Sequence, residues 1–482
     1  YISVTGVQTC ALPIFLYKYP GFMLTGKDAN DSFSTVISDI LPLMKILFVS
    51  TEFEEQARGI TGIIKAMITA AKADGHEVGI LAGYPNTDRN ESELLDKKVE
   101  HIYLQHYLTT GKKDIYPASL RSKRTLLSIL AKRDYLKHKE VNIDHSLIRH
   151  TSNLANKLDY VIKLPYAYHF INHGLGSVPK RALKQAIKKY GIDLVITGAP
   201  MDLRKEEVAP ASLIQFVHDT MPIDMLETPA DNETPQRFAR QLFAAATGSD
   251  MIFTNSKDTA SKVHEINPEA NIQVLYGTAS SRADQFKDTS YLQRKGLEKD
   301  NYLVFVSVVE RRKNLQTLFD AYMKAYPKLK MPLVIVGGKG YGYKDIVKHH
   351  AELPDDIRKN IILAGFVSEA DKYALLNNAR AFVFPSLYEG IGLPIIEAFF
   401  SQLPVLTSRK GALPEAGGDA ALYVEDPYDV DEVSDALVKI ATDNELREKL
   451  RSNIHKQTAK FTPEKFTERF KKAIHELGNK GQ

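Results

Sequence analysis

The chain contains no tryptophan and only one cysteine, Cys10, among its 482 residues. A single cysteine excludes an internal disulfide, and no group of cysteines and histidines has the spacing of a zinc site. No apolar run approaches the roughly 18–20 residues that a membrane-spanning helix needs. The net charge of +4 is too small to indicate a nucleic-acid partner. These absences favour a globular protein of a reducing, cytoplasmic compartment that does not bind nucleic acid.

The first 43 residues differ in character from the rest of the chain. The segment Val4–Ile14 resembles the conceptual translation of a sequencing-adapter read. It lacks the basic start, the continuous apolar stretch and the small-x-small cleavage site of a signal peptide. We therefore expect residues 1–43 to lie outside the evolved fold and translation to begin at Met44, in which case Cys10 has no functional meaning.

From Met44 onward, short apolar runs alternate with longer amphipathic segments, a pattern typical of α/β proteins. Buried strands are predicted at Ile46–Val49, Val78–Leu81, Leu194–Thr197, Ile214–Val217, Leu303–Val308, Leu333–Val336, Ile361–Leu363 and Ala381–Phe384. Helices are predicted at Ile60–Ala73, Arg181–Lys189, Leu315–Ala325, Asp371–Asn377 and Val433–Ile440. The two series, separated by the polar stretch Ser280–Asp300, predict two doubly wound domains over 44–285 and 286–461. Residues 462–482 are predicted to contain a last helix, with Thr462 as its N-cap and Pro463 in its first position.

The stretch from Gly111 to Lys163 holds 12 Lys/Arg against 5 Asp/Glu, interleaved with leucine, isoleucine and tyrosine. A solvated helical face explains any one of these charges. As a cluster they also suit a peripheral contact with anionic lipid headgroups, or guidance of an anionic acceptor.

Two carboxylates, Glu389 and Glu397, flank a glycine-rich turn that leads into a helix. The backbone N–H groups of Gly390, Ile391, Gly392 and Leu393 precede the positive end of that helix, where a phosphate or a polarised hydroxyl binds well. Carboxylates repel phosphate but accept hydrogen bonds from vicinal sugar hydroxyls. The combination therefore indicates a nucleotide sugar. Taken alone, Glu389 is an ordinary loop residue and Glu397 a helix-start charge that complements the helix dipole, and only their combination favours a functional role.

Positive charge for a pyrophosphate follows the strand predicted at Leu303–Val308, where Arg312 and Lys313 precede a helix. Arginine grips phosphate oxygens bidentately and lysine acts as a mobile point charge, although surface Arg-Lys pairs are common. The glycine-rich turn Val336–Gly342 has neither the Walker ending nor the dinucleotide fingerprint. After the strand at Ile361–Leu363, the backbone of Phe366 and Val367 either faces a nucleobase or forms an ordinary strand-to-helix turn.

Three features of other segments complete the set of candidates. His218 and Asp219 follow the strand predicted at Ile214–Val217, where a doubly wound domain exposes its ligand residues. Gly59 precedes a helix whose amides can face the phosphate site of the other domain. Asp429-Val-Asp431 has the form of a metal-binding Asp-x-Asp motif, but Asp429 precedes an amphipathic helix. We assign it to helix capping and expect no metal.

Together these motifs resemble the retaining glycosyltransferases of the GT-B fold, specifically glycosyltransferase family 4 with its Glu-x7-Glu signature. The resemblance runs from about Met44 to the C-terminus and is strongest from Leu303 to Val424. There Glu-Arg-Arg-Lys-Asn, Val-Gly-Gly-Lys-Gly, Phe-Pro-Ser-Leu-Tyr-Glu-Gly-Ile-Gly-Leu-Pro and Gly-Ala-Leu-Pro-Glu occur in the family's order. The family implies an α/β fold of two doubly wound Rossmann-like domains facing each other across a cleft. It places the acceptor with the first domain and the donor with the second, and packs the last helix back on the first domain.

The resemblance also implies roles for the second-domain candidates. Glu397 would hold the ribose hydroxyls of the donor, and Glu389 would contact the donor sugar near its 3-hydroxyl. Arg312 and Lys313 would neutralise the leaving diphosphate. The main chain of 390–393 would add hydrogen bonds, and the main chain of Phe366 and Val367 would bracket the base.

In the first domain, the resemblance implies that His218 touches the transferred sugar, that Asp219 belongs to the same motif, and that Gly59 lets this domain close over the phosphates. One departure is Val308, because many family members carry an arginine there and Arg312 would then supply that charge alone. The Arg-Lys-Asn and His-Asp-x-x-Pro motifs resemble mannosyl- and rhamnosyl-type transferases, so GDP-mannose is the expected donor.

The implied reaction is metal-independent transfer of a hexosyl group, with retention, from a nucleoside diphosphate sugar to a glycan or lipid-linked acceptor of the cell envelope or surface polysaccharide. No carboxylate is clearly placed as a covalent nucleophile, so the departing diphosphate itself would take the acceptor proton. Two enzymatic alternatives keep the fold: a nucleotide-sugar epimerase or a phosphorylase. A third alternative is a non-catalytic scaffold that binds a sugar nucleotide.

Overall fold

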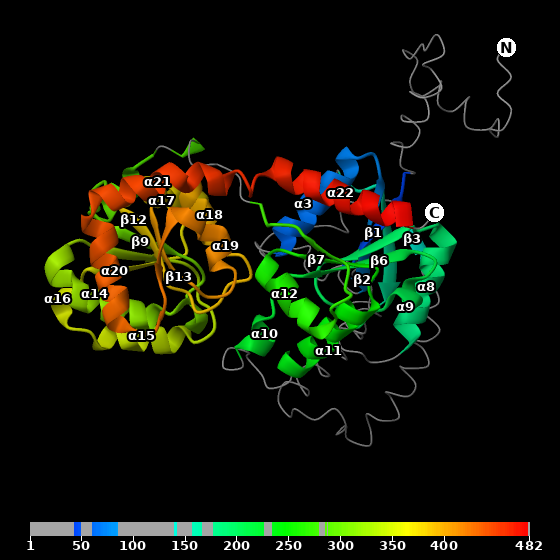
Figure 1. Ribbon diagram of the computed structural model, residues 1–482, viewed down its shortest axis with the longest axis horizontal. Coiled ribbons are helices and arrows are strands. Elements are labelled where there is room, and N and C mark those ends of the chain that lie inside the picture. The colour runs from blue at the N-terminus through cyan, green and yellow to red at the C-terminus, as the bar shows by residue number, and fades with distance from the viewer. Residues whose placement is uncertain are drawn as a thin grey trace, which may run out of the picture.

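Two domains, each built around a largely parallel sheet with helices on its faces, make up the protein (Figure 1). The computed structural model describes residues 43–49, 60–84, 139–141, 157–165, 177–225, 234–278, 285–286 and 288–480. Gly59, residues 1–42 and most of the basic stretch 111–163 were singled out in the sequence and lie outside the described residues.

An eight-stranded sheet forms the first domain in the order β3-β4-β2-β1-β5-β6-β7-β8. Its strands are β1 (Lys45–Val49), β2 (Glu77–Tyr84), β3 (Lys139–Val141), β4 (Tyr160–Pro165), β5 (Leu194–Thr197), β6 (Ser212–Val217), β7 (Met251–Thr254) and β8 (Ile272–Val274). The helices are α3 (Ile60–Ala73), α8 (Ser177–Tyr190), α9 (Lys205–Val208), α10 (Met221–Asp224), α11 (Thr234–Gly248) and α12 (Lys257–Ile266). Neighbouring strands are parallel except β3 and β4, which are antiparallel.

The second domain contains a six-stranded parallel sheet in the order β11-β10-β9-β12-β13-β14. Its strands are β9 (Leu303–Val306), β10 (Leu333–Val336), β11 (Ile361–Gly365), β12 (Ala381–Phe384), β13 (Val405–Ser408) and β14 (Ala421–Val424). Its helices are α13 (Ser290–Arg294), η3 (Arg311–Lys313), α14 (Leu315–Leu329), α15 (Tyr343–Glu352), α16 (Asp355–Arg358), α17 (Glu369–Asn378), α18 (Leu393–Phe400), α19 (Leu413–Gly417), η4 (Gly418–Ala420), α20 (Val430–Thr442) and α21 (Asn444–Thr458). The strand order reverses between β9 and β12, which defines the switch point of a doubly wound sheet.

The central strands are continuous apolar runs because helices cover both faces of the sheet. All four residues of β9, β10 and β12 are buried. The strand predicted at Leu303–Val308 ends two residues earlier than expected, at Val306. Val309 is buried and forms a bridge with Lys339, whereas Val308 is 48% exposed. Val308 and Val309 therefore belong to the turn that leads to η3, and not to the sheet.

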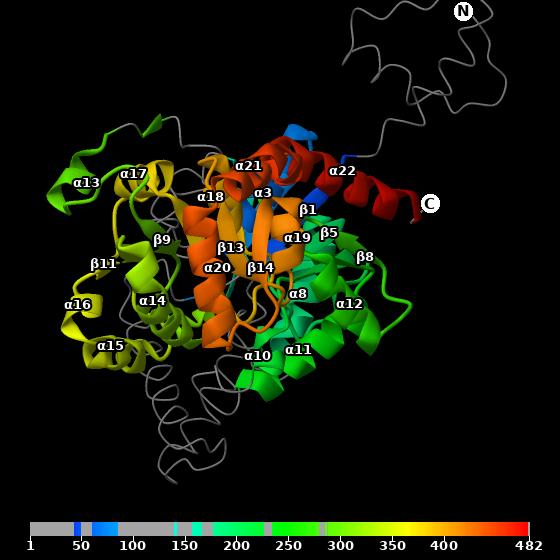
Figure 2. The ribbon, with the colours of Figure 1, turned by 60° about the vertical axis from the view of Figure 1, so that its left-hand side comes forward.

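The C-terminal helix α22 (Pro463–Lys480) leaves the second domain and packs on the first (Figures 1 and 2). Phe466, Phe470 and Ile474 are buried in the same core as the first-domain strands and α3. The side chain of Asp74, at the end of α3, binds Lys471 at 2.8 Å and Nε2 of His475 at 2.8 Å. None of the described helices is long and apolar enough to cross a membrane.

Candidate functional site

The segments that follow β9 and β12 meet at the switch point of the second sheet. The backbone N–H of Leu387 donates to the carbonyl of Arg312 at 2.8 Å, and Oγ of Ser386 lies 3.0 Å from the same carbonyl oxygen. The loop after β12 is therefore hydrogen-bonded directly to η3. This contact brings the predicted Arg312 and Lys313 beside the predicted Glu389, although 76 residues separate them in the sequence.

Glu389 is the centre of a charge cluster formed with Arg312 and Lys313. Its Oε1 accepts from Nζ of Lys313 and, at 2.8 Å, from Oγ of Ser386. Its Oε2 lies 2.9 Å from Nη1 of Arg312. Nε of Arg312 lies 2.6 Å from Oε1 of Glu310, an ion-pair contact whose angles are not those of a hydrogen bond. Two cations and two carboxylates thus lie at the end of β9.

The charged groups of this cluster are buried, which strengthens the interactions between them. Lys313 is 2% exposed and Glu389 is 7% exposed. Burial alone would raise the pKa of the Glu389 carboxyl, but Lys313 and Arg312 outweigh it and hold that pKa below its usual value. Burial alone would lower the pKa of Arg312, but Glu389 and Glu310 outweigh it and raise that pKa. Glu389 and Arg312 are therefore charged at neutral pH. The carboxylate of Glu389 orients the side chains of Arg312 and Lys313.

Two glycines shape the loop between Glu389 and α18. Gly392 is the N-cap of α18 and has φ of 77°, a left-handed conformation that favours glycine. Gly390 faces the first domain, because a Cβ added to it would lie 2.6 Å from the carbonyl oxygen of His218 and 2.9 Å from Cβ of Asp219. Only a residue without a side chain permits this approach of the two domains.

His218 follows β6, and its ring stacks on Phe216 with a centroid distance of 4.3 Å. Its Nε2 lies 2.7 Å from the carbonyl oxygen of Gly198. Since a carbonyl only accepts, Nε2 carries the proton and Nδ1 is an acceptor in the neutral ring. Burial lowers the pKa of His218 to about 4. The ring is therefore neutral at pH 7 and suited to accept a hydrogen bond from a hydroxyl.

Asp219 comes next in the chain and lies within the electrostatic reach of the second-domain cations. Its Oδ1 accepts from the backbone N–H of Met221 at 3.1 Å, which orders the turn before α10. Burial raises the pKa of Asp219, while that hydrogen bond and the charge of Arg312 oppose the rise. Asp219, after β6 of the first domain, therefore lies close enough to the switch point of the second sheet to interact with the charge of Arg312.

Comparison with known proteins finds a family that matches the second domain. Residues 288–457 match the family described as "Glycosyl transferases group 1". The second domain is a group 1 glycosyltransferase domain. The serotype-specific mannosyltransferase WbdA of Escherichia coli is 27% identical over 317 residues, which cover 62% of this chain and 38% of WbdA. The O-antigen chain mannosyltransferase B of Escherichia coli is 36% identical over 159 residues, which cover 33% of this chain and 41% of the relative. This chain therefore spans less than half the length of these relatives.

Solved structures resemble the chain over nearly its whole length. HepE of Anabaena, in complex with UDP and glucose, aligns with a TM-score of 0.57 and 16% identity over 89% of this chain and 99% of HepE. WaaG, described as a glycosyltransferase involved in lipopolysaccharide biosynthesis, aligns with a TM-score of 0.55 and 16% identity over 88% of this chain and 98% of WaaG. At this identity the likeness shows the fold alone. The fold is GT-B, as the sequence predicted.

Glu397 lies on α18 of this group 1 domain, in an ion pair of its own. Its Oε1 accepts from Nζ of Lys372, on α17, at 2.9 Å, and both side chains are partly buried. Phe366 and Val367 follow β11, and the side chain of Phe366 is 69% exposed. Among the described contacts, Glu397 is joined to α17 and not to the cluster of Glu389.

The sequence reasoning missed three partners of the predicted residues. Glu310 and Ser386 lie within the quoted motifs, two or three residues from Arg312 and Glu389, so their proximity was a usable signal. Lys372 lies 25 residues before Glu397, and no pattern in the sequence indicates that pairing. Asp429 is the N-cap of α20, and its Oδ1 accepts from the N–H of Asp431 at 2.8 Å, so the capping prediction is confirmed.

Proposed function

We propose that the protein is a retaining glycosyltransferase of family 4 that transfers a hexosyl group from a nucleoside diphosphate sugar to an acceptor hydroxyl. The observation that carries this proposal is the buried cluster of Arg312, Lys313 and Glu389 at the switch point of a group 1 glycosyltransferase domain. A switch point is where a doubly wound sheet binds its ligand. Two oriented cations at that point suit a leaving diphosphate.

In this mechanism the charge that develops on the departing diphosphate is stabilised by Arg312, by Lys313 and by the N–H groups at the start of α18. Such preorganised donors contribute most when the charge develops in the transition state. The diphosphate takes the proton of the acceptor hydroxyl on the same face from which it leaves. Glu389 contacts a hydroxyl of the donor sugar, and the neutral ring of His218 accepts from another. Asp219 supports His218 within the same turn.

Donor recognition is completed by Glu397, which binds the ribose hydroxyls, and by the main chain of Phe366 and Val367, which brackets the base. The backbone of 390–393 binds the phosphates, and Gly59 lets the first domain approach them. The reaction needs no metal or other cofactor. GDP-mannose is the proposed donor, because the names of several curated relatives describe mannosyltransferases.

The proposed acceptor is a glycan or lipid-linked saccharide of the cell surface, because relatives are named for O-antigen and capsular polysaccharide synthesis. The protein would act in the cytoplasm, where a peripheral contact with the anionic inner face of the membrane would bring it to a lipid-linked acceptor.

The test is release of free nucleoside diphosphate that depends on an acceptor. Purified protein is incubated with GDP-mannose, UDP-glucose and other nucleotide sugars, with and without lipid-linked acceptors, and the anomeric configuration of the product is read by NMR. Lys313→Ala should lower transfer by at least about 10²-fold, because it removes one charge that stabilises the leaving group. Release of diphosphate without an acceptor, or an inverted product, would contradict the proposal.

A matched control is Lys324→Ala, which removes an exposed ion pair with Asp431 on the outer helices α14 and α20. This variant should transfer sugar at the wild-type rate, because surface ion pairs contribute little. Circular dichroism and thermal unfolding establish that both variants are folded. A folded Lys313→Ala protein with near-wild-type turnover would exclude Lys313 from the reaction.

A further inference from the structure

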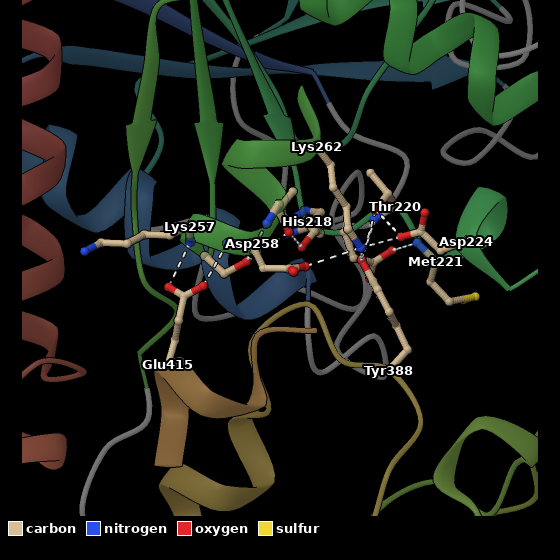
Figure 3. Close-up of polar contacts among 12 residues, drawn as sticks. His218, Thr220, Met221, Asp224, Lys257, Asp258, Lys262, Tyr388 and Glu415 are labelled. Atoms are coloured by element: carbon tan, nitrogen blue, oxygen red, sulfur yellow. Dashed lines mark hydrogen bonds and ion pairs between the residues drawn. The ribbon is translucent and has the colours of Figure 1, made fainter. Parts of the chain in front are cut away.

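Tyr388, the residue before Glu389, connects the charge cluster to the other domain. It belongs to the loop after β12, yet its hydroxyl contacts Thr220 and Lys262 of the first domain (Figure 3). The side chain is 5% exposed, and Thr220 is 3% exposed. A buried polar group at a domain boundary is costly unless its hydrogen bonds are made.

The hydrogen bonds of this hydroxyl are complete. The oxygen accepts from the backbone N–H of Thr220 at 3.2 Å and from Nζ of Lys262 at 3.2 Å. Oγ1 of Thr220 donates to Oδ2 of Asp224 at 2.6 Å and lies 3.0 Å from the Tyr388 hydroxyl. Because Thr220 has given its proton to Asp224, the proton of Tyr388 points to Thr220. The hydroxyl therefore uses its one proton and both lone pairs on the first domain.

Lys262 strengthens this contact. Its Nζ binds Oδ2 of Asp224 at 2.5 Å and lies 4.3 Å from the centre of the Tyr388 ring, a cation–π arrangement. Burial alone would lower the pKa of Lys262, but Asp224 and Tyr388 outweigh it and raise that pKa. Burial also raises the pKa of Tyr388. A charged lysine and a neutral phenol thus face each other at neutral pH.

The main chain of Tyr388 belongs to the reaction site. Its carbonyl oxygen accepts from Nη1 of Arg312 at 3.0 Å and lies 3.3 Å from Oγ of Ser386. Its neighbour Glu389 binds Arg312 and Lys313. A single residue therefore contacts the first domain through its hydroxyl and the cation of the second domain through its carbonyl.

A second contact uses the same first-domain helix. Glu415, from α19, accepts from the backbone N–H groups of Lys257 and Asp258 at 2.8 Å each (Figure 3). It also accepts from the hydroxyl of Tyr276 at 3.2 Å. It lies at the N-terminus of α12, about one turn before Lys262. The second domain thus contacts α12 at two places, the N-terminus and Lys262.

We propose that Tyr388 is a positioning residue for the transfer reaction: through its hydroxyl the first domain holds the main chain that orients Arg312 against Glu389. The inference rests on the proposed function. When the domains separate, the carbonyl of Tyr388 loses its anchor and Arg312 loses its alignment. When they meet, the hydroxyl contacts Thr220 and Lys262, and the cation returns to the position in which it receives the leaving diphosphate.

The test is Tyr388→Phe in the full chain, which removes the hydroxyl and keeps the ring. We expect kcat to fall about tenfold, the size of effect that corresponds to one lost buried hydrogen-bonding group. The affinity for free GDP, measured by calorimetry, and the donor KM should change less than threefold, because the second-domain binding groups remain. Hydrogen exchange of the amides in 310–314 should become faster, although the substituted residue lies elsewhere in the chain.

The matched control is Tyr423→Phe, which removes a hydroxyl that donates to the carbonyl of Gly418 at 2.9 Å within the second domain. It should leave kcat and the exchange of 310–314 unchanged. Thr220→Val combined with Tyr388→Phe should be no slower than Tyr388→Phe alone, since both act through one contact.

The outcomes separate this inference from the proposed function. If the wild type transfers sugar and Tyr388→Phe transfers at the same rate, the inference is overturned and the proposed function stands. If the folded wild type transfers sugar from no donor, the proposed function falls. The exchange data then decide whether the Tyr388 hydroxyl orders residues 310–314. Faster exchange of 310–314 supports the positioning contact, and unchanged exchange overturns it.

Discussion

Replacing Glu389 by glutamine isolates the charge of the buried cluster with almost no change of shape. The substitution leaves Lys313 and Arg312 without their shared counter-ion, at a position where Lys313 is 2% exposed. Removing one partner of a buried ion pair costs about 3–5 kcal/mol, because the remaining charge is uncompensated. Arg312 keeps Glu310 at 2.6 Å, so the low end of that range applies and we expect a loss of about 3 kcal/mol.

The pH dependence of stability gives an independent check. The folded pKa of Glu389 is held below its value in the unfolded chain. Its contribution to stability is therefore present above the unfolded pKa, near pH 4.3, and is lost as the pH falls through the folded pKa. Glu389→Gln should be less stable than the wild type at pH 7, and the difference should shrink in more acidic solution.

Urea unfolding from pH 7 down to pH 3 measures this difference. Glu425→Gln is the control, because Glu425 forms an exposed pair with Arg409 and should change stability by less than about 0.5 kcal/mol. Transfer by Glu389→Gln should fall about 10²-fold or more even when the protein is saturated with donor. A variant as stable as the wild type at pH 7, or equally destabilised at every pH, would refute the reasoning.

Two further predictions concern the domain boundary and the donor. Gly390→Ala should leave GDP affinity within threefold and lower kcat more than tenfold, because its Cβ would lie 2.6 Å from the His218 carbonyl across the boundary. A folded Gly390→Ala protein with the kcat of the wild type would contradict the expectation. Lys372→Met should weaken GDP binding about tenfold, the low end of the range expected for a hydrogen bond to a charged group, because Glu397 loses the partner at 2.9 Å that orients it. That loss should disappear for a deoxyribose analogue of GDP measured by calorimetry, and a loss of the same size for the analogue would place Lys372 elsewhere in binding.

Much of the second domain was predictable because its strands are buried on both faces. Leu333–Val336 and Ala381–Phe384 were predicted with the bounds that the structure shows, since each is an uninterrupted apolar run. Once those strands are placed, the rule for doubly wound sheets brings the segments after β9 and β12 together. The proximity of Arg312, Lys313 and Glu389 follows from topology.

Other elements could not be read in this way. Val308 extended an apolar run without belonging to the strand, because a bridge from Val309 to Lys339 draws the chain into a turn. The strands Met251–Thr254 and Val405–Ser408 were not predicted. Val405–Ser408 ends in two hydroxyl residues, so its apolar run is only two residues long. The partners of Tyr388 and Glu397 depend on how distant segments meet, which no local pattern encodes.

The packing of α22 on the first domain means that the polypeptide passes between the domains twice, once before β9 and once at the start of α22. Two chain connections allow the domains to bend about the line that joins the two connections. They resist rotation of one domain about either connection alone. The buried side chains of Phe466 and Phe470 also make the last residues part of the first domain's core. Deletion of α22 would therefore destabilise the first domain. It would also leave a single connection, about which the two domains could rotate.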